Sequence, residues 1–301
     1  MKNRRRRRWG SCLTVILGVA VLVAGVVAAV NWATDSRQFV RERCTAVVPD
    51  PERPGEMLNQ SLAPDQAANA ALVAGTSVRR GMQARAATIG LATAMQESKL
   101  RNIDYGDEAG PDSRGLFQQR PSQGWGTQAQ VMDPVYAANR FFQELATFDY
   151  ASMRVTQAAQ RVQRSAFPEA YAQHEPMARA FASALTGHSP GALTCTLRPA
   201  EGAGDAQAVA GALDAHLGLA ATAEPGRVVV PATGREAWVV AHWAVAQAAA
   251  EHIVAVQADG RVWERATGQW VAVGDAGSTA VAGRAPEAPA DAVVITLATD
   301  D

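Results

Sequence analysis

The chain has 301 residues, of which 48% are hydrophobic and 19% charged, which is typical of a globular protein with about two domains. Its formal net charge of -1 excludes a wholly basic nucleic-acid-binding protein, so no nucleic-acid partner is expected. The charge is unevenly placed, because Lys2 and Arg4 to Arg8 precede the first apolar run and the remainder of the chain is acidic overall.

The N-terminal segment predicts a transmembrane helix at residues 10–33, behind a cytoplasmic basic tail at residues 1–9. The uncharged run from Cys12 to Val30 would span roughly 28 Å as a helix, about one hydrocarbon core. Trp9 and Trp32 flank it, and the basic tail predicts an N-terminus inside and the bulk of the chain outside the cell membrane. The alternative is a cleaved signal peptide, but the run is long for one and lacks a clear cleavage site.

Three further regions follow in chain order. Residues 34–60 predict an extracellular stalk, because the segment from Pro49 to Glu56 has three prolines and many charges. Residues 61–200 predict a mainly α domain, and residues 201–301 a small α/β domain with a hairpin at Asp259-Gly260.

Apolar periodicity and capping residues place the expected elements. In the first domain the expected helices run from Asp65 to Gly81, Met82 to Leu100, Asp133 to Leu145, Thr156 to Ala166 and Glu175 to Leu185. In the second we expect helices from Asp205 to Leu217 and Arg235 to His252, and strands from Arg227 to Val230 and Ala292 to Ala298.

Glu97 is the carboxylate with the most informative position. It stands at the C-terminal end of an expected helix that is apolar on nearly every side. The negative end of the helix dipole and partial burial both favour the protonated form, which raises the pKa as a general acid requires. The alternative is a solvated glutamate at a frayed helix end.

The residues around Glu97 form a combined motif. Glu97-Ser98 is followed, eighteen residues later, by Gly115-Leu116-Phe117-Gln118, and Asp133-Pro134 opens the next helix. This pattern resembles the signature of the bacterial lytic transglycosylase and goose-type lysozyme superfamily. The resemblance covers residues 61 to about 190 and is nearest to actinobacterial cell-surface and phage proteins with the run GLFQQRPSQGWGT.

The resemblance implies a lysozyme-like cleft with Glu97 as the catalytic acid and residues 115–118 on its floor, where Gln118 hydrogen-bonds sugar. In many transglycosylases a Tyr-Asn pair faces the acid. The corresponding place here is Val162-Gln163, so Gln163 replaces the Asn and Tyr171 is the candidate for the missing hydroxyl. Trp125 either stacks on a sugar or caps the core. The substrate-contacting residues expected are Ser98, Gly115, Leu116, Phe117, Gln118, Gln119, Trp125, Gln163 and Tyr171.

A second carboxylate is needed only for a two-carboxylate glycosidase. The loop after Glu97 offers four candidates, which are Asp104, Asp107, Glu108 and Asp112. Each is also a common turn-forming or solvated residue. Transglycosylases of the superfamily use one Glu, since the substrate's own N-acetyl and hydroxyl groups assist.

The cysteines and histidines predict a disulfide and no metal. Cys44 and Cys195 fall outside the membrane, where a thiol pair usually forms a disulfide; two free thiols are the alternative. The five histidines lack metal-ligand spacing, so no metal or cofactor is expected.

The segment from Trp238 to Trp270 resembles part of D-alanyl-D-alanine carboxypeptidase-like domains, whose Asp-His-Val-His strand holds zinc. Here that strand is Asp291-Ala292-Val293-Val294, without either histidine. The resemblance therefore implies a domain without its metal.

Together these features predict a membrane-anchored muramidase, a lytic transglycosylase that cleaves peptidoglycan strands between N-acetylmuramic acid and N-acetylglucosamine. The rival hypothesis is a catalytically silent wall-binding or scaffold protein that keeps the cleft. The missing Tyr favours the rival, and Glu97 with the Gly-Leu-Phe-Gln segment favours the enzyme.

Overall fold

A computed structural model describes residues 25–26, 41–108, 110–164, 169–273 and 289–300. Residues 42–301 form one compact unit, which holds both expected globular regions. Among the described residues no helix is long and apolar enough to cross a membrane. The expected anchor at residues 10–33 lies outside the described residues, apart from residues 25–26.

The helices agree closely with the periodicity of the sequence, and α7 has the expected bounds. The helices of the compact unit are α2 (Pro64–Arg79), α3 (Ala84–Ser98), α4 (Gln128–Met132), α5 (Pro134–Leu145), α6 (Val155–Gln163), α7 (Glu175–Leu185), α8 (Ala206–Leu217) and α9 (Gly234–Gln247). Two short 3-10 helices are η1 (Pro121–Gln123) and η2 (Ala172–His174).

In the described parts of the chain the strands form two antiparallel sheets. The three-stranded sheet has the order β2-β1-β3, with β1 (Arg43–Pro49), β2 (Met57–Leu62) and β3 (Leu193–Thr196). The six-stranded sheet has the order β4-β5-β9-β6-β7-β8, with β4 (Thr222–Glu224), β5 (Arg227–Pro231), β6 (Ile253–Ala258), β7 (Arg261–Glu264), β8 (Gln269–Ala272) and β9 (Ala292–Leu297).

The expected fold class, a mainly α domain followed by a small α/β domain, was wrong, because 42% of the described residues are helical and 19% are in strands that form two antiparallel sheets. Part of the difference lies in the expected stalk, where β1 and β2 pair as a hairpin. Cys44, Ala46 and Val48 alternate inward along β1 and pack with α7, so this segment has the two-residue period of a half-buried strand. The proline-rich run in the turn between β1 and β2 concealed that period.

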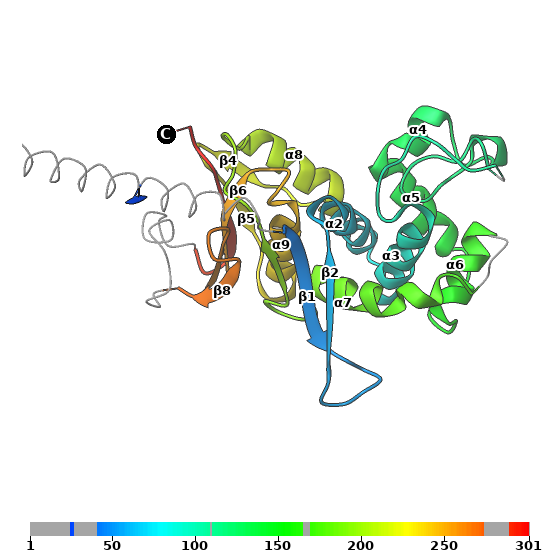
Figure 1. The fold of residues 1–301 in the computed structure, drawn as a ribbon, viewed down its shortest axis with the longest axis horizontal. Helices are drawn as coiled ribbons and strands as arrows, with labels where there is room; N and C mark the ends of the chain where they lie inside the picture. Colours follow the sequence, from blue (N-terminus) through cyan, green and yellow to red (C-terminus); the bar gives the residue numbers. More distant parts are fainter. Residues whose placement is uncertain (1–24, 27–40, 109, 165–168, 274–288, 301) are drawn as a thin grey trace, which may run out of the picture. The chain divides into compact units, whose positions relative to one another are not determined.

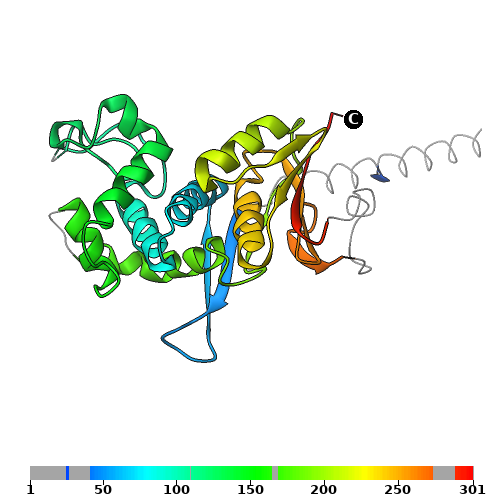
Figure 2. The same ribbon diagram turned by 180° about the vertical axis from the view of Figure 1, so that it is seen from behind.

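Helix α2 lies between two groups of elements (Figure 1). On one side are α8, α9 and the six-stranded sheet, and on the other are α3, α5 and α6; the view from behind shows the same order (Figure 2). Helix α3 is buried along most of its length, and a Cβ at Gly90 would meet the ring of Phe142 at 2.8 Å. This close packing fixes the axis of α3, and with it the place where α3 ends.

The predicted disulfide is formed. Cys44 in β1 is bonded to Cys195 in β3, at directly opposite positions of the three-stranded sheet. Both side chains are buried, and the bond closes a sequence separation of 151 residues. It therefore ties the start of the compact unit to the segment that follows α7.

Candidate active site

Glu97 lies in the last turn of α3, which ends abruptly. The two residues after the helix, Lys99 and Leu100, both adopt a left-handed backbone conformation, with φ of 56° and 55°. Side chains of α2 hold this turn: the Gln66 amide donates to the Lys99 carbonyl at 2.8 Å, and the Asn69 amide donates to the Leu100 carbonyl at 2.8 Å. Left-handed non-glycine residues are strained, and they persist when surrounding contacts hold them.

The Gly-Leu-Phe-Gln segment is docked onto the end of α3. The Ser98 hydroxyl donates to the Leu116 carbonyl at 2.7 Å, which links the two parts of the motif directly. Gly115 has φ of 79°, and a Cβ there would lie 2.1 Å from the Val131 carbonyl oxygen. A glycine is therefore required at this position for both its backbone conformation and its close approach.

Two side chains from later in the chain contact the Glu97 carboxyl. The Tyr171 hydroxyl donates to Glu97 Oε1 at 2.7 Å, and the Gln163 side chain hydrogen-bonds the same carboxyl. The Gln163 amide also donates to the Phe117 carbonyl at 2.7 Å, so it bridges the acid and the docked loop. Tyr171 is fully buried, at the start of η2.

Burial raises the pKa of Glu97 above its ordinary value of 4.5, and it is the largest influence on this group. The hydrogen bonds from Tyr171 and Gln163 act in the opposite direction, because they stabilise the carboxylate. The negative charge of Asp107 raises the pKa further, and the positive charge of Lys99 lowers it. The net effect keeps more of Glu97 protonated near neutral pH than an exposed glutamate would be.

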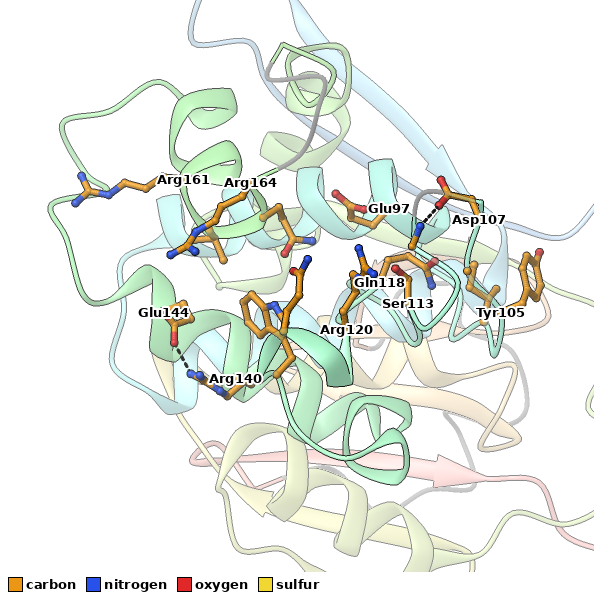
Figure 3. A pocket seen from close by; sticks show the side chains of 18 of the residues that line it. Glu97, Tyr105, Asp107, Ser113, Gln118, Arg120, Arg140, Glu144, Arg161 and Arg164 are labelled. Carbon is orange, nitrogen blue, oxygen red and sulfur yellow. Dashed lines mark hydrogen bonds and ion pairs between the residues drawn. The ribbon is translucent and has the colours of Figure 1, made fainter.

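Glu97 opens into a cleft of about 1200 Å³ (Figure 3). The walls come from the loop after α3, from α5 and from the C-terminal part of α6. In this view Glu97, Asp107 and Tyr105 lie toward one end, and Arg140, Arg161 and Arg164 lie toward the other. Gln118 and Arg120 lie between them.

The four loop carboxylates differ in their surroundings. Of these four, only Asp107 both lines the cleft and raises the pKa of Glu97 through its negative charge. The Asp107 Oδ1 accepts a hydrogen bond from the Gly110 N–H at 2.8 Å. Asp112 accepts hydrogen bonds from Ser122 and is ion-paired with Arg120 at 2.8 Å. The bonds from Ser122, and after them the charge of Arg120, hold the pKa of Asp112 well below its usual range. Asp104 and Glu108 are exposed and do not line the cleft.

Of the residues that we expected to contact substrate, only some reach the cleft. Gln118, Trp125 and Gln163 line it beside Glu97. The others are buried beneath its surface, where they shape the site instead of facing it: Ser98, Gly115, Leu116, Phe117, Gln119 and Tyr171. Phe117 stacks on Phe141 at 4.5 Å between ring centroids, and the Gln119 amide donates to the Ala137 carbonyl.

The aromatic lining also differs from expectation. Trp125 is half-buried, and the Arg140 guanidinium lies 5.5 Å from its ring centroid, so one face of the indole is covered. Tyr105 lines the cleft and is 64% exposed, which leaves its ring open to a sugar. Sequence reasoning missed Tyr105 and the arginines, because a loop tyrosine and helix-surface arginines carry no motif.

No group of three metal-ligating side chains gathers in the part of the chain that the structure describes. Comparison with protein-family models and with curated proteins finds no match for this chain. The function therefore has to be argued from the site.

Proposed function

We propose that this protein cleaves the glycan strands of peptidoglycan as a lytic transglycosylase, with Glu97 as the general acid. The observation that carries the proposal is a half-buried carboxyl, held by Tyr171 and Gln163, that opens into a cleft of about 1200 Å³. The resemblance of Glu97-Ser98 and Gly115 to Gln118 to the transglycosylase motif supports the same assignment. The disulfide is typical of proteins in oxidising compartments, in keeping with a wall substrate outside the cytoplasm.

The proposed reaction begins with proton transfer. Glu97 gives its proton to the glycosidic oxygen as the bond to C1 of N-acetylmuramic acid breaks, since that oxygen leaves poorly as an alkoxide. The 6-hydroxyl of the same sugar then forms a bond to C1 and loses its proton to the Glu97 carboxylate. The acid is regenerated, and the products are a 1,6-anhydromuramyl end and a free hydroxyl on the departing sugar.

The Tyr171 hydroxyl fits this cycle. While Glu97 is a carboxylate, the hydrogen bond to Oε1 stabilises its charge. In many transglycosylases a tyrosine stands at the position that Val162 occupies here, and its absence favoured the hypothesis of a catalytically silent protein. The Tyr171 hydroxyl takes the place of that missing group beside Glu97.

Hydrolysis of the same bond is a second candidate, and Asp107 is the observation that favours it. A hydrolase needs another carboxylate to activate water or to attack C1. Asp107 lines the cleft and acts electrostatically on Glu97, whereas Asp112 is already engaged by Arg120.

Product analysis separates the candidates. The full-length chain is incubated with purified sacculi, and the released fragments are analysed by mass spectrometry for anhydro ends and by borohydride labelling for reducing ends. We expect 1,6-anhydromuramyl ends and activity that survives Asp107→Asn. Reducing-end muramic acid alone, lost in Asp107→Asn, would instead establish hydrolysis. Binding to sacculi without release of any fragment would favour the silent wall-binding protein.

A further inference from the structure

The end of the cleft away from Tyr105 is strongly basic. It carries Arg140 from α5, Arg161 from α6 and Arg164, which directly follows α6 (Figure 3). We refer to these three residues as the arginine end. Their charge contrasts with the rest of the chain, which is acidic overall once the N-terminal basic tail is set aside.

Two of these guanidinium groups have no carboxylate partner among the residues that the structure describes. Arg140 is ion-paired with Glu144 at 2.5 Å. For Arg161 and Arg164, by contrast, no carboxylate partner is found within the described parts of the chain, and both side chains are exposed. Within the described residues, the arginine end therefore keeps a net positive charge from Arg161 and Arg164.

Aromatic rings hold two of the arginines in place. The Arg161 guanidinium lies 4.2 Å from the ring centroid of Phe148, and Arg140 lies 5.5 Å from that of Trp125. Such contacts use the face of the guanidinium plane and leave its N–H edges free for hydrogen bonds. Those edges match the paired oxygens of a carboxylate or a phosphate.

The arginine end is continuous with the proposed acid site. Gln163 hydrogen-bonds Glu97, and it stands immediately before Arg164 and two residues after Arg161. Arg161 lies in the last turn of α6 and Arg164 is the residue that caps this helix, with φ of 55°, and both line the cleft. A glycan held at Glu97 would thus bring the adjoining substituents of the strand toward these arginines.

We propose that the arginine end binds an anionic oxygen group carried by the glycan strand, an inference that rests on the proposed function. Its source is either a carboxylate of the peptide stems or a phosphate of a polymer linked to the strand. Both present two or more oxygens to the exposed edges of Arg161 and Arg164. The bound anionic group determines which part of the glycan strand is positioned in the cleft. Glu97 remains the general acid.

The test measures binding without cleavage. The full-length chain carrying Glu97→Gln is compared with the same chain bearing Arg161→Gln and Arg164→Gln in cosedimentation with purified sacculi. The matched control bears Arg43→Gln and Arg80→Gln, which remove two exposed positive charges outside the cleft. We expect about tenfold weaker binding for the arginine-end variant, unchanged binding for the control, and less salt dependence for the arginine-end variant.

Three preparations identify the source of the anion. Sacculi with phosphodiester-linked polymers are used untreated, stripped of phosphate with hydrofluoric acid, or stripped and then amidated to neutralise the stem carboxylates. If the difference in binding between the arginine-end variant and the control survives stripping but disappears on amidation, the anion is the stem carboxylate. If that difference already disappears on stripping, the anion is the phosphate. Equal binding of the arginine-end variant and the control on all preparations, or no binding by the parent, overturns the proposal.

Cleavage by chains with Glu97 intact separates this proposal from the proposed function. If the chain releases fragments but the arginine-end variant and the control bind equally, the anion-site proposal is wrong and the proposed enzymatic function stands. If binding depends on the arginines but no fragments are released, the anion-site proposal stands and the proposed enzymatic function is wrong.

Discussion

The end of α3 and the interior of α9 each hold a titratable side chain whose pKa is shifted by burial, yet only one of them has the features of a reactive site. His242 in α9 is fully buried, and its Nδ1 lies 2.8 Å from the Ala184 carbonyl. Trp238 and Trp270 pack around its ring, and it lines no part of the cleft. Glu97 instead contacts the polar side chains of later elements and opens into the cleft.

The difference teaches that burial alone does not mark a site. In each region burial disfavours the charged form, so the pKa of Glu97 rises and that of His242 falls to about 4. His242 has a backbone carbonyl as its partner and no route to a substrate, so its shifted pKa affects stability. Glu97 has side-chain partners and lines the cleft, so its shifted pKa matters to the reaction that we propose.

The largest expected effect on stability tests whether the two regions unfold together. Replacing both cysteines, Cys44→Ala with Cys195→Ala, removes a crosslink whose chain-entropy stabilisation is at most about 5 kcal/mol for so long a loop. Because residues 42–301 are one compact unit, the cleft and α9 should lose structure at the same, lower urea concentration. Tryptophan fluorescence and binding to sacculi report the two regions, and widely separated transitions would show that they unfold independently.

A second prediction concerns His242 and pH. Its pKa is about 4 when folded and about 6.5 when unfolded, so the unfolded chain binds the proton more readily. The contribution of neutral His242 to the free energy of unfolding is therefore fully present above pH 6.5 and is lost as the pH falls toward 4. Between pH 7 and pH 5 this loss is about 2 kcal/mol. Urea unfolding should show a smaller pH difference in His242→Asn.

His216 remains in both proteins and contributes in the same direction, since its pKa is also lowered to about 4. Cleavage at pH 7 should be unchanged in His242→Asn, in line with the distance of this region from the cleft. An unaltered pH dependence of unfolding would contradict the structural role given to His242.

The third and smallest effect concerns Tyr171. Its hydrogen bond lowers the pKa of Glu97, so Tyr171→Phe should raise that pKa further. Because a general acid works only while protonated, the alkaline limb of the pH–rate profile should move to higher pH. The maximal rate should fall about tenfold, as the carboxylate loses a stabilising bond. Tyr150→Phe, outside the cleft lining, is the control, and an unshifted limb in Tyr171→Phe would break the link between this contact and catalysis.

Much of the helical framework could be predicted from the sequence. The period of apolar residues and the capping signals placed α7 with its bounds and α5 to within a residue. The Asp259-Gly260 signal located the β6–β7 hairpin. Strands β1 and β2 were missed, since their burial depends on packing against α7, far along the chain.

The candidate site was predictable only where a motif marked it. Glu97 and Gln118 lie in the cleft as the motif implied, but Ser98 and Phe117 are buried supports. The arginine end could not be foreseen, because Arg140 and Arg161 come from separate helices and meet only in the folded chain. Surface arginines on a helix carry no signal of the cleft that they line.

Replacement of Glu97 tests the central claim most directly. Glu97→Gln keeps the shape of the side chain and removes its proton, so the protein should fold with unchanged stability and still bind sacculi. Its rate of fragment release should fall by about 10²- to 10⁴-fold, while Glu236→Gln, an exposed charge change at the start of α9, should leave the rate unchanged. A Glu97→Gln protein that released fragments as fast as the unaltered chain would contradict the assignment of Glu97 as the acid.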